Sequence, residues 1–291
     1  MIIINILGGL GNQMFQYAFA YAISQQKESV VKLDIGIFET YDLRKYELDL
    51  FNVSLPIGTN EESNVLKYKH ESLFEKLLRK LRRKSIPLSE NYYKEAHFNF
   101  DKKAYTRGDN SYFEGYWQSE KYFLKYRENI LQEFSLKEEL HPKSKNYQKK
   151  IFSTESVSLH IRRGDYVTNA HINSVHGTCS LDYYKSAVKE IENKVSNPHF
   201  FIFSDDLVWA KDNLSFIERI TLIDLEREIP DHEDMLLMSH CKHNIIANSS
   251  FSWWGAWLNK NPKKIVIAPL KWFNETSKNT IELIPETWVR L

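Results

Sequence analysis

Apolar residues recur along the chain in short, strand-length runs separated by helix-length segments. The first runs are residues 2–6 (IIINI) and 30–34 (VVKLD). Between them, Met14, Tyr17, Ala18, Tyr21 and Ala22 repeat at the i, i+3, i+4 spacing of one helix face. A β-branched strand, a helix and a second strand in this order predict the start of a parallel sheet.

The second half of the chain repeats this alternation. The expected strands are SVSLHI (156–161), HFFIFS (199–204), ITLID (220–224), HNIIA (243–247) and KIVIA (264–268). The middle, roughly residues 60 to 150, is rich in Lys, Glu and aromatic residues and is predicted to be mostly helical. We therefore expect two α/β domains, 1–150 and 151–291, with the C-terminal segment as a candidate to pack back on the first domain.

Composition narrows the class of protein. With 42% hydrophobic and 26% charged residues in 291, the chain is typical of a soluble globular protein. Its formal net charge of +1 argues against nucleic-acid binding, which needs a basic face. The aromatic share of 14% suits either packing or stacking against sugars and bases.

The cysteines and the N-terminus indicate the compartment. Cys179 and Cys241 are too few for a disulfide framework and form no CxxC pair, which favours a reducing compartment. The first 22 residues are apolar but lack a basic n-region, and glycines, Asn12 and Gln13 interrupt them. No apolar run approaches the 18 residues of a membrane span, so a cytoplasmic location is expected.

One basic amphipathic segment, SLFEKLLRKLRRK (72–84), has two explanations. Five apolar residues fall on one face and six basic residues lie mostly opposite: Leu73, Phe74, Leu77, Leu78 and Leu81 against Lys76, Arg79, Lys80, Arg82, Arg83 and Lys84. The favoured explanation is a helix whose apolar face packs on the core. The alternative is a surface helix resting on anionic lipid, with peripheral contact at the inner membrane.

The stretch GGLGNQMFQ (8–16) is the first candidate site. Gly9 and Gly11 let the backbone approach a ligand closely, and the following helix N-terminus offers unpaired N–H groups. It is no dinucleotide fingerprint, since Met14 stands where the last glycine would be needed. A tight strand–helix turn explains the glycines equally well, whereas the amides of Asn12 and Gln13 could bind ligand hydroxyls.

The stretch HIRRGDY (160–166) is the second candidate site. It would lie at the carboxyl edge of a parallel sheet, where α/β folds bind ligands. Neighbouring side chains on a strand point to opposite faces, so Arg162 and Arg163 are expected to differ in role. Arg162 suits bidentate contact with a diphosphate. Asp165 is expected to orient an arginine, and His160 is either a base-binding group or a satisfied core histidine.

Two acidic or histidine-rich stretches raise the question of a metal. IFSDD (202–206) ends a strand with two carboxylates, and Asp206 is expected to accept hydrogen bonds from a ribose or a base edge rather than to bind a metal. HCKH (240–243) is a single short cluster without the second half of a zinc site. No metal site is predicted.

The last candidate is NSSFSWWGAWL (248–258). Serines between a strand and an apolar helix are typical of an anion-binding helix N-terminus. The three tryptophans, Trp253, Trp254 and Trp257, are expected to pack in the core.

Together and in this order, GGLGNQMFQ, HIRRGDY, FSDD and NSSFSWWGAWL closely resemble the α-1,2-fucosyltransferases of glycosyltransferase family 11. EGYWQSEKYF (114–123) and VHGTCSLDYY (175–184) are also similar to bacterial members. The resemblance covers residues 7 to about 269. It implies a GT-B architecture, two Rossmann-like domains facing across a cleft, with an acceptor side in the N-terminal domain and the donor side in the C-terminal one.

The resemblance also implies a reaction. GDP-β-L-fucose would be the donor, a terminal β-galactoside of a surface polysaccharide (O-antigen) or lipid-linked glycan the acceptor, and transfer would invert without a metal or other cofactor. Arg162 would hold the phosphates, and Asn12 would line the cleft. The remaining donor contacts would come from His160 and Asp206 near the guanine or ribose and from Ser250, Phe251 and Ser252 near the diphosphate.

The base that takes the acceptor proton is left open among Asp165, His176 and Glu114. Two rivals remain: a GDP-sugar transferase of another linkage, and a non-catalytic carbohydrate-binding protein suggested by the Trp and Tyr content.

Overall fold

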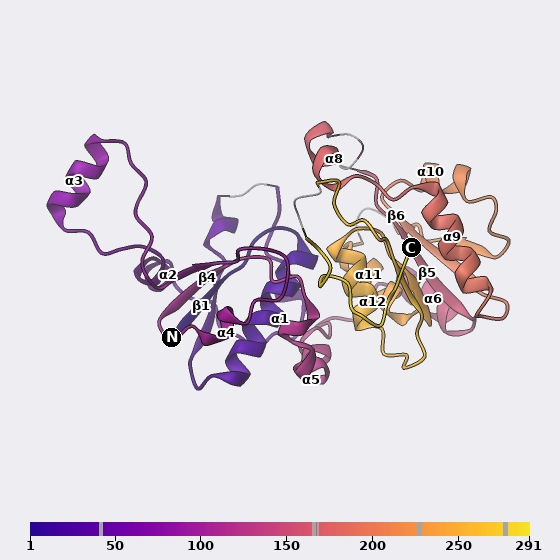
Figure 1. The fold of residues 1–291 in the computed structure, drawn as a ribbon. Helices are drawn as coiled ribbons and strands as arrows, with labels where there is room; N and C mark the ends of the chain where they lie inside the picture. Colours follow the sequence, from indigo (N-terminus) through magenta and orange to yellow (C-terminus); the bar gives the residue numbers. More distant parts are fainter. Residues whose placement is uncertain (41–42, 165–166, 168, 226–228, 276–278) are drawn as a thin grey trace. The chain divides into compact units, whose positions relative to one another are not determined.

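The computed structural model describes residues 1–40, 43–164, 167, 169–225, 229–275 and 279–291, with the backbone alone for 170–172 (Figure 1). The chain divides into two units, Met1–Lys137 and Glu138–Leu291. This division precedes the predicted residue 150 because helix α6 (Pro142–Phe152) packs on α11 (His232–His240) of the second unit.

Unit 1 is built on a parallel sheet of four strands in the order β2-β1-β4-β3. In chain order its strands and helices are β1 (Ile2–Asn5), α1 (Leu10–Gln26), β2 (Val31–Asp34), α2 (Asn60–Lys67), α3 (Leu73–Leu81), β3 (Tyr92–Lys94), α4 (Lys103–Thr106), β4 (Ser111–Glu114) and α5 (Arg127–Glu133). Short 3-10 turns cover Gly36–Glu39, Leu48–Leu50, Glu120–Tyr122 and Leu124–Tyr126. The predicted β1-α1-β2 opening is confirmed.

The prediction of a mostly helical middle is wrong in part. Strands β3 and β4 lie there, and β4 pairs with the buried strand β1 in the centre of the sheet. Each is only three or four residues long and ends in a charged residue. Pairing of β4 with β1 and of β3 with β4, rather than local pattern, therefore determines that these residues form strands.

The helix that the 14, 17, 18, 21, 22 spacing predicted is α1, but it is buried on nearly all sides. A cluster of aromatic rings packs against α1 and includes Phe113 of strand β4. Phe19 stacks on Trp117 at 4.1 Å between ring centroids and meets Tyr122 edge-on at 5.2 Å. Much of the high aromatic content is thus used for packing in this unit.

Unit 2 contains a parallel sheet of six strands in the order β10-β9-β8-β5-β6-β7. After α6 its elements are β5 (Ser156–Ile161), α8 (Ala170–His176), α9 (Leu181–Glu192), β6 (His199–Ser204), α10 (Leu207–Asn213), β7 (Ile220–Leu222), α11, β8 (His243–Ile245), α12 (Ser250–Leu258), β9 (Val266–Ala268) and β10 (Val289–Arg290). All five predicted strands are present. The C-terminal strand β10 pairs with β9 and so belongs to the second unit's sheet.

Two sequence predictions about side chains can be compared directly with burial. Trp253, Trp254 and Trp257 on α12 are at most 1% exposed, so the prediction of core packing is confirmed. The apolar face of α3, by contrast, is exposed, with Leu73 at 87% and Leu81 at 72%. The favoured prediction for this segment, a core-facing helix, is therefore wrong.

Cys179 and Cys241 are free thiols, and burial raises the pKa of Cys179 to about 11.

No helix in the described part of the chain has both the length and the apolarity that crossing a bilayer requires.

Candidate functional site

The strand order of unit 2 creates a switch point beside β5. From β5 the chain builds outward through β6 and β7 on one side, and then crosses to β8 on the other. Ligands of open α/β sheets bind outside the carboxyl ends of the strands at such a point. Arg162 after β5, Asp205 after β6 and Ser249 after β8 leave three neighbouring strands at this edge.

Arg162 is held at this edge by the carboxylate of Asp205, a residue for which no role was predicted. Its Nη1 lies 2.9 Å from Oδ2 of Asp205, and both side chains are about one-quarter exposed. The other oxygen of Asp205, Oδ1, accepts the backbone N–H of Arg163 at 2.8 Å. A Cβ at Gly164 would lie 2.7 Å from Oδ2, so a larger residue there would displace the carboxylate of Asp205.

Arg163 has a different role, as the alternation of side chains on a strand predicted. Its guanidinium lies over the ring of Trp209, 4.4 Å from the centroid, and its Nε is 3.2 Å from Oδ2 of Asp206. This cation–π contact and ion pair fix the arginine against α10. Arg163 therefore pairs with Asp206 and α10, whereas Arg162 pairs with Asp205.

Asp206 has structural partners for both of its oxygens. Oδ1 accepts the backbone N–H of Trp209 at 2.9 Å and so caps α10, while Oδ2 pairs with Arg163. The predicted contact of Asp206 with a ribose or base stays a prediction, and these two interactions compete with it.

His160 is the penultimate residue of β5 and is 6% exposed. Burial, aided by the charge of Arg162, lowers the pKa of its imidazole to about 3, so the ring is neutral. Its ring centroid is 6.0 Å from that of Phe251 on α12. Among the described residues its buried Nδ1 has no hydrogen-bond partner, and the base-binding role of His160 stays a prediction.

The N-terminus of α12 follows β8. Ser249 occupies the N-cap position but its side chain makes no capping hydrogen bond, and the first turn contains no acidic residue. Free N–H groups and the positive end of the helix dipole favour an anion at such a helix start. Ser250 and Phe251 are half-buried there.

Ser252 is oriented differently from the expectation that placed it near a diphosphate. It is fully buried, and its hydroxyl donates toward the carbonyls of Ala247 at 3.4 Å and Ser249 at 3.3 Å. Its predicted ligand contact is untested, but this geometry favours a role inside the helix.

His176 lies at the C-terminal end of α8, where its ring is 5.2 Å from that of Phe273. Its carbonyl accepts the side-chain amide of Asn248, which also donates to the carbonyls of Gly177 and Trp272. Asn248 directly precedes Ser249 and Ser250 at the start of α12. Its side chain therefore holds the backbone at His176 next to this helix start. Asp165, predicted to orient an arginine, lies outside the described residues.

Unit 1 presents its own polar edge after β1. Gly9 is the N-cap of α1, and its carbonyl accepts the N–H groups of Asn12 and Gln13. Gly8 has a positive φ of 81°, and a Cβ there would lie 2.9 Å from Nδ2 of Asn12. Gly11 is buried in the first turn.

Of the two amides at this turn, only Asn12 is available for a ligand. Gln13 is fully buried: its Nε2 donates to the carbonyls of Gly8 and Lys45, and its Oε1 accepts the N–H of Glu47. Asn12 is half-buried and its Oδ1 accepts Nε2 of Gln118 at 2.8 Å. Its Nδ2 has no acceptor in the described part of the chain.

Gln118 reaches Asn12 through a strained turn after β4. Trp117, which is fully buried, adopts a positive φ of 55°, a conformation that costs a bulky residue energy. The N–H groups of Tyr116 and Trp117 donate to the carboxylate of Glu95 at 2.7 and 3.1 Å. Burial raises the pKa of Glu95 to about 7.

The model of glycosyl transferase family 11 matches residues 1–290. The chain belongs to glycosyltransferase family 11. It is 36% identical to an α-1,2-colitosyltransferase of Escherichia coli, an alignment covering 100% of this chain and 99% of that protein. It is 34% identical to the O-antigen biosynthesis glycosyltransferase WbnK of Escherichia coli, with 98% of each covered. A galactoside 2-α-L-fucosyltransferase of Bos taurus is 24% identical over 88% of this chain and 63% of its own length.

A solved structure supports the fold of this family 11 chain. The fucosyltransferase NodZ from Bradyrhizobium superposes with a TM-score of 0.52 and 13% identity, over 87% of this chain and 91% of that one. Together with the two parallel sheets, this likeness confirms the predicted α/β fold class of GT-B type. The predicted cleft between the two domains remains a prediction.

Three residues at the polar edges of the separate units were not identified from the sequence, one in unit 2 and two in unit 1. Asp205 lies in FSDD, where its neighbour Asp206 was preferred, and Gln118 lies in EGYWQSEKYF, where Glu114 alone had a predicted role, as a candidate base. Glu95 gave no signal, because it directly follows β3, a strand that was not predicted. The HCKH histidines have separate partners, since His240 faces Gln148 and His243 accepts the N–H of Ile265.

Proposed function

We propose that this family 11 enzyme transfers L-fucose from GDP-β-L-fucose to the 2-hydroxyl of a terminal β-galactoside, in the synthesis of a bacterial O-antigen. The observation that carries the proposal is the ion pair of Arg162 with Asp205 at the switch point of the unit 2 sheet. The relatives that transfer to the 2-position of galactosides, and the one named for O-antigen biosynthesis, support the acceptor chemistry and the setting.

The donor assignment follows from the charges at this edge. A sugar nucleotide carries two negative phosphates, and Arg162 presents a planar fork suited to them. The uncapped start of α12 adds backbone N–H groups. His160 and Phe251 supply a neutral imidazole and an aromatic ring, which suit hydrogen bonding and stacking with the guanine or ribose.

The reaction forms a bond from the acceptor oxygen to C1 of fucose and breaks the bond from C1 to the β-phosphate. Negative charge grows on the departing phosphate, where Arg162 and the α12 N–H groups would stabilise it without a metal ion. Attack from the opposite face turns the β-linked donor into an α-linked product. The acceptor proton goes to a base or to the departing phosphate.

Four residues are candidates for that base. The sequence indicates His176, Glu114 and Asp165, and Glu95 joins them because its pKa of about 7 suits proton transfer near neutral pH. Glu114 lies 3.4 Å from the ammonium of Lys94, so its carboxylate already has an ion-pair partner. We assign the role to none of the four.

A second donor has specific support. The relative at 36% identity is an α-1,2-colitosyltransferase, so transfer of colitose with the same linkage is the alternative function. The two reactions would share the nucleotide-binding residues and differ in the pocket for the sugar. A non-catalytic carbohydrate-binding protein is disfavoured by membership of an enzyme family and by the arginine at the sheet edge.

The experiment that tests the proposal measures GDP release from GDP-fucose with EDTA present. Acceptors would include lactose and Galβ1,3-GalNAc, and GDP-colitose would be supplied in a parallel series. We expect acceptor-dependent release from GDP-fucose and an α-1,2 linkage by NMR of the product. Release from GDP-colitose alone would replace the donor in this proposal. Loss of release in EDTA that Mg²⁺ restores would contradict metal independence.

A positioning role for Asp205 can be tested in the same assay. Asp205→Asn keeps an acceptor for the N–H of Arg163 but removes the charge that holds Arg162. We expect kcat/KM to fall roughly five- to tenfold, the size of a partly exposed ion pair worth about 1 kcal/mol. The matched control is Asp212→Asn on α10, which is exposed and should change kcat/KM less than twofold. Equal activity of the two variants would show that other contacts hold Arg162.

A further inference from the structure

Helix α3 lies on an excursion that leaves unit 1 after α2 and returns before β3 (Figure 1). The two ends of this excursion are joined at a neck. Tyr68 and Leu88 form an antiparallel bridge, the N–H of Lys69 donates to the carbonyl of Pro87 at 2.9 Å, and the N–H of Ser89 donates to Lys67 at 3.0 Å. The neck anchors residues 69–87, the α3 excursion, to the unit 1 sheet.

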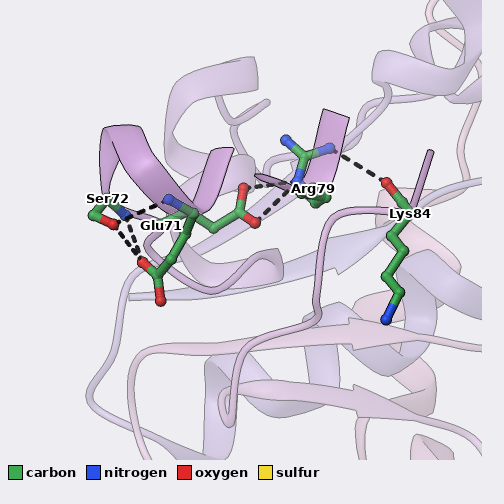
Figure 2. A network of polar contacts seen from close by, with 5 residues as sticks. Glu71, Ser72, Arg79 and Lys84 are labelled. Carbon is green, nitrogen blue, oxygen red and sulfur yellow. Dashed lines mark hydrogen bonds and ion pairs between the residues drawn. The ribbon is translucent and has the colours of Figure 1, made fainter. Parts of the chain in front are cut away.

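Polar contacts at its ends hold α3 in shape. Ser72 and Glu75 form a reciprocal capping box at the N-terminus. Nε of Arg79 lies 2.9 Å from both carboxylate oxygens of Glu71, and Nη1 reaches the carbonyl of Lys84 (Figure 2). A helix of nine residues is marginal alone in water, so these contacts matter. They lie on the polar side and leave the apolar side uncovered.

The apolar side of α3 is exposed rather than packed. Leu73, Phe74, Leu77 and Leu81 are 87, 68, 57 and 72% exposed. At 3.6 residues per turn, these four fall within an arc of about 100°, with Leu78 beyond one edge and Lys80 and Lys76 beyond the other. An arc of exposed leucine and phenylalanine on one face marks an interaction surface.

Charge on the α3 excursion is concentrated and positive. Residues 69–84 contain seven Lys or Arg and two Glu, a net +5, whereas the whole chain has +1 and the remainder therefore −4. Arg82, Arg83 and Lys84 follow the helix directly, and Lys76 and Lys80 flank its apolar arc. A partner surface that matches the α3 excursion would be apolar and negatively charged.

We propose that the α3 excursion docks on the surface of an anionic lipid bilayer. The apolar arc would enter the boundary between headgroups and acyl chains, and the flanking cations would meet lipid phosphates, with their aliphatic stems against the apolar layer. A second copy of the chain does not fit this surface, since pairing two arcs would bring together two groups of +5. The proposal does not depend on which sugar the enzyme transfers.

The test is sedimentation of the full chain with phosphatidylcholine vesicles that contain 0 or 40% phosphatidylglycerol, without any sugar nucleotide. We expect binding to the anionic vesicles, at least tenfold weaker binding to the neutral ones, and loss of binding as salt is raised, because surface attraction decays within a Debye length. Equal binding to both vesicle types, or no binding, would overturn the proposal.

Two double variants on the excursion have matched controls elsewhere. Leu77→Gln with Leu81→Gln removes apolar surface, and its control is Val208→Gln with Leu270→Gln, also highly exposed. Arg82→Gln with Arg83→Gln removes charge, and its control is Lys185→Gln with Lys189→Gln on α9. We expect each excursion variant to bind anionic vesicles at least tenfold more weakly and each control to stay within twofold.

Two further readouts separate this proposal from others. Transfer to a water-soluble acceptor should be unchanged in all four variants, so failure of the sugar-transfer proposal would leave the vesicle result standing. Light scattering reports the oligomeric state. A dimer that Leu77→Gln with Leu81→Gln dissociates would assign the arc to self-association and overturn the lipid proposal.

Discussion

Arg162→Lys is expected to lower turnover 100- to 1,000-fold while leaving the fold intact. Lysine keeps the positive charge but loses the planar fork that can grip a diphosphate with two parallel hydrogen bonds. Its single ammonium would have to serve both Asp205 and a phosphate, whereas the Nη1 of Arg162 that lies 2.9 Å from Asp205 is one of several donors. Loss of one preorganised donor to a developing charge typically costs about 3–4 kcal/mol in the barrier, which is the size of this decrease.

The measurement is kcat for GDP release from GDP-fucose, with GDP affinity by calorimetry and the thermal midpoint as a check on folding. Arg219→Lys is the control, because Arg219 is also in unit 2 but is exposed beside β7, away from the carboxyl edge. Turnover of Arg162→Lys within a few-fold of the wild type would remove Arg162 from the phosphate site. Unchanged kcat with weaker GDP binding would make it a ground-state contact only.

Trp253→Ala is expected to lower the free energy of unfolding by about 3–5 kcal/mol, a large share of the stability of a domain this size. Trp253 is fully buried and its ring lies 5.0 Å from Trp254, 6.2 Å from Trp257 and 5.4 Å from Trp288. Its Nε1 donates to the carbonyl of Leu283 at 2.9 Å. Alanine would leave a cavity among these rings and a buried carbonyl without its donor.

Urea unfolding followed by circular dichroism measures this effect, and the transition must be tested for a second step because the chain has two units. Phe216→Ala is the control: its ring is 37% exposed in the same unit, and a loss under about 1.5 kcal/mol is expected. Trp253→Phe separates the two causes, since it keeps a ring but not the N–H. A loss below about 1 kcal/mol for Trp253→Ala would contradict the packing described for α12.

The sequence predicted strands best where the chain buries them on both faces. The bounds of β5 and β6 match the predicted segments 156–161 and 199–204, because both are interior strands that are buried along almost their whole length. The runs at 243–247 and 264–268 are longer than β8 and β9, since their remaining residues belong to connections: Ile246 and Ala247 are buried, and Lys264 and Ile265 are half-buried. Apolar pattern reports burial, and strand pairing sets the bounds.

Where burial depends on residues distant in the sequence, the pattern of apolar residues did not predict the structure. The short strands β3 and β4 are defined by pairing in the unit 1 sheet, which no local window contains. The spacing of leucines in α3 correctly predicted an apolar face. It could not indicate whether anything covers that face, since the answer lies in the position of the whole excursion.

The candidate site was predictable to the level of strand ends. Arg162 and His160 follow from the rule that ligands bind beyond the carboxyl ends of parallel strands. The choice between Asp205 and Asp206 depends on the backbone path of a short turn and required the observed hydrogen bonds. The inward direction of Ser252 and the approach of Gln118 to Asn12 likewise depend on backbone geometry, including the positive φ of Trp117.

The neck at Tyr68 and Leu88 makes residues 69–87 an exchangeable cassette. The chain enters and leaves at adjacent, antiparallel positions, so nothing beyond the neck is needed to complete the unit 1 sheet. A two-residue Asn-Gly turn joins antiparallel chains at the same spacing. The cassette could therefore be replaced by such a turn, or by another membrane-binding peptide, without change to the rest of the unit 1 fold. For the same reason its length could differ between related enzymes.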